Sequence, residues 1–162
     1  HAFGVETMWM RGEKQTNLIT NINYTGLIKR WNMPSGQANL WFMTGIGEAS
    51  GDSSGFSYSP SVQFDYETTR LYFLAKARMV RAPHIQYDTY SVQGGFSFYE
   101  TSFEETQPWF VVEARTTENM AMRNEITPAL RFINQNYFLE LGITNPWDSE
   151  SRTPRLNLML TF

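Results

Sequence analysis

Apolar and polar residues alternate along almost the whole chain, in segments separated by turn residues. A period of two places every second side chain on the same face of a β-strand. Helical signals are nearly absent, because apolar residues at three-and-four spacing never continue beyond two turns. The pattern predicts an all-β chain with one domain over residues 1–162. We expect a closed antiparallel barrel of about ten strands, within a range of roughly eight to twelve. The expected strands are residues 2–11, 17–31, 37–48, 56–66, 70–81, 85–99, 108–117, 126–133, 136–145 and 154–162.

Each expected strand has one apolar face without a charged residue. In the last strand, Leu156, Leu158 and Leu160 alternate with Arg155 and Asn157. Such a face specifies the pairing register, because a shift by one residue would exchange the two faces. We expect the opposite face to line the lumen of the barrel. The charged residues predicted to lie there are Glu6, Lys29, Asp65, Lys76, Arg78, Glu113, Arg115, Arg131, Glu140 and Arg155.

Two orientations fit this alternation. In a soluble barrel of the lipocalin kind the apolar face points inward, whereas in a membrane barrel it contacts lipid. The polar face holds more Asn, Ser, Thr, Gln and Gly than Lys or Glu, which favours a lumen over a solvated surface. A barrel of this size is also too narrow to enclose the Phe, Tyr and Leu of every strand. Aromatic residues near strand ends are typical of the two interfacial girdles of a membrane barrel. They include Phe3, Trp9, Tyr66, Phe98, Tyr137 and Phe162.

Composition and charge narrow the classes of function. The chain has no cysteine, which excludes disulfides and thiolate metal sites. Its net charge is −3 and it has no long Lys/Arg cluster, so we expect no nucleic-acid partner. No apolar run approaches the length of a membrane helix, about 20 residues. The chain begins at His1 without a basic and then apolar segment. This favours a mature N-terminus left by removal of a secretory signal, although an artificially trimmed chain would look the same.

The segment Leu156-Asn157-Leu158-Met159-Leu160-Thr161-Phe162 resembles the C-terminal strand signal of bacterial outer-membrane β-barrels. In that family, apolar residues alternate toward a terminal aromatic residue, here Leu158, Leu160 and Phe162, and the outer-membrane assembly machinery reads them. The resemblance implies an even number of strands, an exterior in contact with outer-membrane lipid, and both termini in the periplasm. A second and shorter similarity, over Met8-Trp9-Met10-Arg11-Gly12-Glu13, is to the copper-resistance outer-membrane barrels.

The implied topology places the connections alternately on the two sides of the membrane. The turns at 32–36, 67–70, 100–107 and 134–136 would face the periplasm, and the loops at 12–16, 49–55, 82–84, 118–125 and 146–153 would face outside. These outer loops are short, unlike those of porins and adhesins. Pro60 and Pro128 fall within expected strands, near the outer start of each, where a proline without an N–H is tolerated at a bulge.

Three methionines are candidate ligands for a soft metal. Met8 and Met10 share the lumen face of the first strand, and Met159 lies on that of the last strand, which would close against the first. Thioethers suit Cu(I), so copper is the one cofactor considered. The alternative is that these side chains fill a narrow lumen. His1 offers an α-amine and an imidazole to Cu(II), but His84, the other histidine, is expected at the opposite end of the barrel.

The lumen charges leave two interpretations open. They form ion pairs that fill the interior, such as Arg115 with Glu113 or Glu140, or they line a weakly anion-favouring passage. The first hypothesis for function is therefore passive passage of small solutes or ions. The alternative is a non-conducting barrel that anchors or supports a partner complex in the outer membrane.

An outer-membrane hydrolase is the least expected function. His84, Asp88 and Ser91 match no motif for nucleophilic catalysis, and short loops cannot build a substrate cleft. We expect no enzymatic activity and no catalytic residue. The expected partners are outer-membrane lipid, the assembly machinery and a protein complex.

Overall fold

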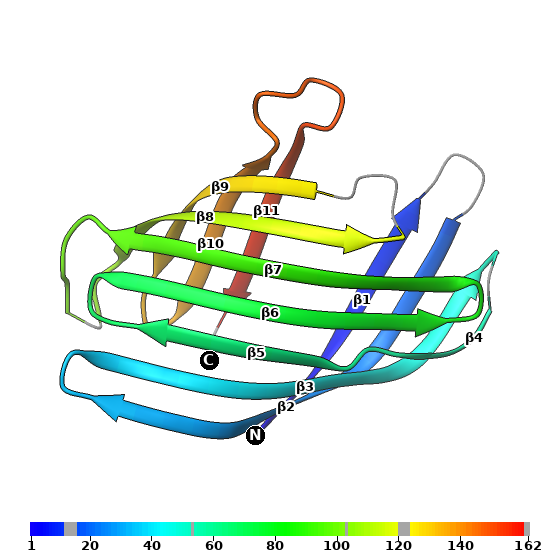
Figure 1. Ribbon diagram of the computed structural model, residues 1–162, viewed down its shortest axis with the longest axis horizontal. Coiled ribbons are helices and arrows are strands. Elements are labelled where there is room, and N and C mark those ends of the chain that lie inside the picture. The colour runs from blue at the N-terminus through cyan, green and yellow to red at the C-terminus, as the bar shows by residue number, and fades with distance from the viewer. Residues whose placement is uncertain (12–15, 53, 103, 120–123, 161–162) are drawn as a thin grey trace.

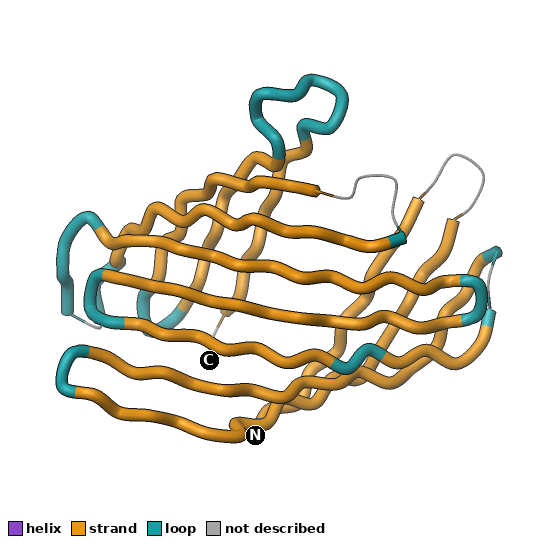
Figure 2. The backbone as a smooth tube through the Cα atoms, viewed as in Figure 1, coloured by secondary structure: helices purple, strands orange, loops and turns teal. Residues whose placement is uncertain are grey.

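The structure is a computed structural model that describes residues 1–11, 16–52, 54–102, 104–119 and 124–160. These residues confirm the all-β fold, because they form one antiparallel sheet of eleven strands and no helix (Figure 1, Figure 2). Across the described ranges there is no helix with the length and apolar character needed to cross a membrane. The strands are β1 (Ala2–Arg11), β2 (Thr16–Met33), β3 (Gly36–Gly51), β4 (Gly55–Tyr58), β5 (Ser61–Glu67), β6 (Leu71–Ala82), β7 (Ile85–Ser97), β8 (Gln107–Glu118), β9 (Asn124–Ile133), β10 (Tyr137–Thr144) and β11 (Thr153–Leu160).

The additional strand arises at Pro60. The sequence predicts a single strand over 56–66, but the structure divides it into β4 and β5. Ser59 and Gly45 exchange two backbone hydrogen bonds, of 2.8 and 3.2 Å, just before the division. Pro60 has no N–H to donate, and its carbonyl oxygen accepts from the backbone N–H of Met79 on β6 at 3.0 Å. The expected count of ten strands is therefore corrected to eleven by a local break in one of them.

The strands pair in the order β1-β2-β3-β4-β6-β7-β8-β9-β10-β11, and β5 pairs with β3 and β6. The sheet is strongly curved, and β1, β10 and β11 cross behind the long central strands in Figure 1. Side chains meet across its concave side, where Glu6 on β1 contacts Arg78 on β6 and Met8 contacts Tyr87 on β7. Within the described ranges, however, no ladder joins β11 back to β1. The closed ring expected from the sequence is thus not formed by these residues, whose sheet ends at β1 and β11.

The sheet has two faces of opposite character, here called the interior (concave) and the exterior (convex). Along β2, Asn17, Ile19 and Asn21 are buried, whereas Leu18 and Ile22 are exposed. The exposed exterior side chains include Phe3, Val5, Ile46, Phe56, Leu71, Phe73, Val92, Leu130, Leu141, Ile143, Leu156 and Leu158. The buried interior side chains include Asn39, Ser57, Ser59, Ser61, Asp65, Ser91, Glu113, Thr127, Arg131 and Glu140. Charged groups are thus enclosed while large apolar groups face outward, the reverse of the usual distribution in water.

The connections lie at two ends of the sheet. Because the strands are antiparallel, residue 1 and the turns at 34–35, 68–70 and 134–136 share one end, here called the terminal end. The hairpin at 83–84 and the loop at 145–152 lie at the opposite end, here called the loop end.

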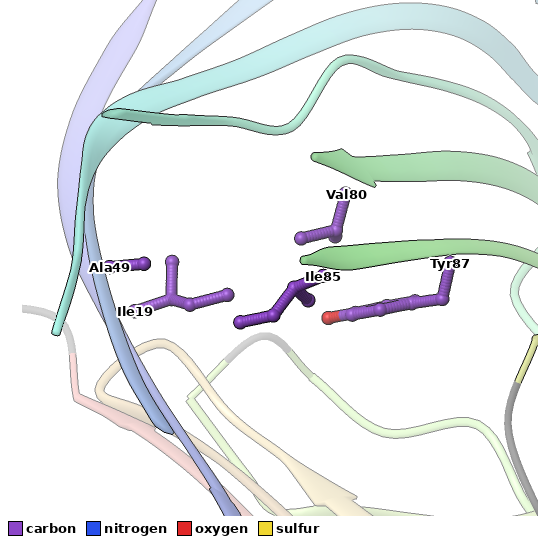
Figure 3. Close-up of a cluster of buried hydrophobic side chains, with 5 residues drawn as sticks. All are labelled: Ile19, Ala49, Val80, Ile85 and Tyr87. Carbon is purple, nitrogen blue, oxygen red and sulfur yellow. The ribbon is translucent and has the colours of Figure 1, made fainter. Parts of the chain in front are cut away.

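The interior is apolar near the loop end. Ile19 on β2 and Ala49 on β3 point toward Val80, Ile85 and Tyr87, which come from the opposite wall formed by β6 and β7 (Figure 3). All five side chains are buried. This apolar cluster packs two walls of the curved sheet against each other. It lies closer to the loop end than the charged part of the interior.

Candidate functional site: the charged interior

The two-residue period of each strand directs its charged side chains inward. On β6, Leu74, Lys76 and Arg78 lie on the interior face, and Phe73 and Ala77 lie on the exterior face. The same alternation operates on the other strands, so interior side chains from distant parts of the chain come within bonding distance. Among the described residues, the charged interior is therefore the place where polar chemistry is concentrated away from solvent, and it is the candidate functional site.

Glu6 and Arg78 connect β1 to β6 across the interior. The Arg78 guanidinium donates from Nη1 to Oε1 of Glu6 at 2.8 Å and from Nη2 to Oε2 at 2.5 Å. Such a bidentate, charge-assisted pair has a fixed geometry. Arg78 Nη2 also donates to the Ser59 hydroxyl at 3.3 Å, and the Asn23 amide donates to Glu6 at 3.4 Å. The pair neutralises both charges and ties together two strands that do not pair with each other.

Arg131 and Glu140 form the most deeply buried ion pair among the described residues. Their side chains are only 7% and 6% exposed, and Arg131 donates from Nε and Nη2 to Oε2 of Glu140 at 2.8 and 2.6 Å. Nη2 also donates to the Gln93 amide oxygen at 3.0 Å. The guanidinium carbon lies 4.8 Å from the ring centroid of Tyr72 and 4.9 Å from that of Phe138. Ion pair and rings together fill the interior toward the terminal end.

Asp65 is a buried carboxylate whose hydrogen bonds come from neutral donors. The side-chain N–H groups of Asn39 and Trp41 each donate to it at 2.7 Å, and the Gln63 amide donates at 3.3 Å. Asn39 in turn accepts from Nε of Arg30 at 2.7 Å. Three donors on one carboxylate compensate for the loss of hydration, and no cation of the described residues forms an ion pair with Asp65.

Two further ion pairs depend on the strand register. Arg155 on β11 bonds to Glu113 on β8, which links two strands that are not neighbours. Arg115 bonds to Glu125, because the β8–β9 register places these residues directly opposite each other. The expected pairing of Arg115 with Glu113 or Glu140 is therefore replaced by a pairing that the register decides.

The two predicted lumen lysines have different surroundings. Lys29 is exposed, and its Nζ lies 5.0 Å from the ring centroid of Trp31. A register shift in the β2–β3 ladder between Leu27 and Lys29 interrupts the alternation at this point, so Lys29 does not join the enclosed charges. Lys76 is half-buried in the interior, and no described carboxylate forms an ion pair with it.

A small polar cavity of about 90 Å³ lies beside Lys76 and the Glu6–Arg78 pair. It brings together three charged groups, three interior hydroxyls, one amide and one thioether. Its lining residues are Glu6, Asn23, Thr25, Met43, Thr44, Gly45, Ser59, Ser61, Lys76 and Arg78. This cavity in the charged interior has room for a small ligand.

Of the three methionines proposed as Cu(I) ligands, the structure describes the side chain of Met8. The sulfur of Met8 accepts a hydrogen bond from the Tyr87 hydroxyl at 2.7 Å, and Met8 packs against the apolar cluster. The side chains of Met10 and Met159 lie outside the described part of the chain, so the copper site stays a prediction. In the described ranges, no group of three or more His, Asp or Glu side chains is placed to hold a metal ion.

The proposed assembly signal is described only at its beginning. Leu158 is exposed on the exterior and pairs with Leu139 of β10, and the backbone of Leu160 pairs with Tyr137. Phe162 lies outside the described residues.

His84, Asp88 and Ser91 do not form a connected catalytic group in the described residues. His84 is exposed at the tip of a tight hairpin, with a φ of 60°. The Asp88 carboxylate bonds to Arg81 at 2.6 Å, whereas Ser91 is buried in the interior. No hydrogen bond links these three side chains in the described ranges.

Sequence reasoning did not anticipate the apolar cluster inside the sheet. Ile19, Val80 and Ile85 occupy positions of the face that was expected to be polar. The available signal was their position in the two-residue alternation, because Ile19 lies between Asn17 and Asn21 on the interior side of β2. Applying the alternation to apolar as well as charged residues would have found them.

Comparisons of the chain with protein-family models, with curated proteins and with solved structures found no match. Function is therefore inferred from the geometry of the two faces and of the charged interior.

Proposed function

We propose that the protein is an outer-membrane β-barrel that anchors or supports a partner complex, with a packed interior in place of an open pore. The observation that carries this proposal is the opposite polarity of the two faces. Large apolar side chains such as Phe3, Val5 and Leu156 are exposed on the exterior. Their exposure costs free energy in water but not in contact with acyl chains. Charged side chains in a membrane protein face the interior and pair with one another, as Arg131 and Glu140 do here.

Contacts across the interior favour anchoring over conduction. Successive levels are occupied by the apolar cluster, the Glu6–Arg78 pair, the Glu113–Arg155 pair and the Arg131–Glu140 group. In a narrow barrel, side chains from opposite walls are long enough to meet and fill the lumen. A barrel of this kind contributes a stable, membrane-embedded body, on which partner proteins assemble at the ends or along the exterior.

Placement in a membrane requires the sheet to close. The edges of β1 and β11 carry backbone N–H and C=O groups, and each group left without a partner in hydrocarbon costs several kcal/mol. We therefore propose that β1 pairs antiparallel with β11. Because the chain has no cysteine, a disulfide between Val5→Cys and Leu156→Cys, or Val5→Cys and Leu158→Cys, tests closure directly. Val5→Cys with Val92→Cys on β7 is the control that should not cross-link. If neither the pair with Leu156→Cys nor the pair with Leu158→Cys forms a disulfide, the proposal of a closed barrel is refuted.

A charge placed on the exterior tests the membrane environment. Val92 lies in the middle of β7 and is 48% exposed. In lipid vesicles, Val92→Arg should lower the free energy of unfolding by about 2–4 kcal/mol, the cost of Arg at the bilayer midplane. Gln86→Arg, exposed at the start of β7 near the loop end, is the matched control and should cost at most about 1 kcal/mol. Equal and small effects, or a monomer that stays folded in buffer without an amphiphile, would rule out the membrane proposal.

The proposed orientation places the terminal end in the periplasm and the loop end outside the cell. A membrane-impermeant maleimide added to intact cells should label His84→Cys at the loop end. It should leave Gln135→Cys, in the exposed turn at the terminal end, unlabelled until the outer membrane is permeabilised. The reverse pattern would invert the proposed topology.

Passage of small ions is the second candidate function. The polar cavity beside Lys76 and Arg78 favours it, because two cations and one carboxylate line the cavity. Reconstitution into planar bilayers separates the two functions. Discrete, anion-favouring conductance steps would support passage, and silence at all voltages and salt concentrations would leave the anchoring role.

A further inference from the structure

We propose that the polar cavity beside Lys76 binds a small monovalent anion, such as chloride, as the counter-ion of the lysine ammonium group. The site is internal and faces β1, β2, β3 and β6 at the break between β4 and β5. This inference goes beyond the anchoring function and does not depend on it, because the cavity exists whether or not the exterior contacts lipid.

The charge balance around Lys76 calls for an anion. Both Glu6 and Glu113 lie close enough to attract Lys76, but Glu6 is already engaged by Arg78 and Glu113 by Arg155. Each of those pairs is neutral, and Asp65 on the neighbouring β5 is held by the neutral donors Asn39, Trp41 and Gln63. Among the described residues, Lys76 is therefore left without a carboxylate in direct contact. An unpaired charge in a partly dehydrated site is costly, and a bound counter-ion removes much of that cost.

Donors for an anion are also present. Lys76 can supply three N–H groups, and the hydroxyls of Thr25 and Ser61 belong to interior residues that line the same cavity. Among the described residues, Thr25 has no side-chain hydrogen bond, and the Ser61 hydroxyl has only a long contact of 3.5 Å with the Met43 carbonyl. These hydroxyls are therefore available to turn toward an anion, which accepts several donors at once.

The size of the cavity selects the ligand. A volume of about 90 Å³ has room for about three water molecules at roughly 30 Å³ each. Chloride or bromide fits this space together with one or two waters, whereas gluconate does not. A water beside the anion would also donate to the Asn23 amide oxygen, which is buried without a donor from the described residues.

Anion-dependent thermal unfolding in detergent micelles tests the site. Wild-type protein is compared in sodium chloride and in sodium gluconate at equal ionic strength, so that general screening is the same. Chloride should raise the Tm by at least about 2 °C, because it binds the folded state alone. Lys76→Met should remove this difference, while Lys29→Met, which deletes an exposed lysine, should keep it. Equal Tm values in the two salts, or an unchanged chloride effect in Lys76→Met, would overturn the proposal.

Bromide provides a direct second measurement, and it covers the case in which Lys76→Met does not fold. Crystals of the wild-type protein grown in sodium bromide should show an anomalous peak in the cavity, next to Nζ of Lys76. A cavity without such a peak would refute the anion site. It would leave membrane placement untouched, because that proposal is tested separately on Val92.

Discussion

Arg131→Met should be among the most destabilising single substitutions of an interior charged residue. It removes three hydrogen bonds, two to Glu140 and one to Gln93, together with the cation–π contacts to Tyr72 and Phe138. Methionine keeps most of the side-chain volume, so the main effect is on charge. The substitution leaves the carboxylate of Glu140 enclosed without its cation, because that residue is only 6% exposed.

The expected cost is about 3–5 kcal/mol, the range for breaking a buried ion pair by removing one partner. Removing both charges should be much less harmful, since the double variant Arg131→Met/Glu140→Met leaves no isolated charge. We therefore expect the double variant to regain at least about half of the loss. The coupling free energy from the double-mutant cycle measures how strongly the two side chains depend on each other.

Urea unfolding in lipid vesicles, followed by tryptophan fluorescence, gives the free energies for this cycle. Arg152→Met is the matched control, because Arg152 is exposed in the loop at 145–152 and should change stability by no more than about 0.5 kcal/mol. If Arg131→Met behaves like this control, or if the double variant is worse than the sum of the single variants, the reasoning from an enclosed ion pair is refuted.

Two further predictions concern a close backbone contact and a loop carboxylate. Gly47→Ala should lower stability by about 1–3 kcal/mol in urea unfolding, because its Cβ would overlap a carbonyl oxygen of β2. Gly94→Ala, whose Cβ meets nothing within 4 Å, should be nearly neutral, and equal effects would contradict the packing argument. In the loop, the Ser151 hydroxyl and the Glu150 backbone N–H hold the pKa of the Asp148 carboxyl below its usual value. These hydrogen bonds to Asp148 therefore stabilise the loop at pH values above the pKa that the carboxyl has in the unfolded chain. The stabilisation is lost as the pH falls through the lowered pKa of the carboxyl in the folded loop. Hydrogen exchange at the Glu150 amide should accelerate in that acid range beyond its intrinsic rate, and unchanged protection would refute this link.

Much of this protein can be predicted from local sequence alone. The two-residue period identifies strands because successive side chains of an extended chain point to opposite faces. That rule placed Arg78, Glu113 and Arg131 on the opposite side from Val92 and Leu156, as the burial of these residues shows. The turns between strands follow equally from short clusters of Gly, Pro, Asn and Ser.

The tertiary structure decided which interior side chains meet. Arg115 pairs with Glu125 because of strand register, and Glu6 reaches Arg78 because curvature brings β1 opposite β6. A local pattern excludes a register shift of one residue, but it does not distinguish registers that differ by two residues, and it does not show curvature. Lys29 is exposed because a register shift in the β2–β3 ladder turns its side chain away from the interior. Alternation is a property of a single strand, whereas contacts across the interior depend on how far each strand slides and turns relative to all the others.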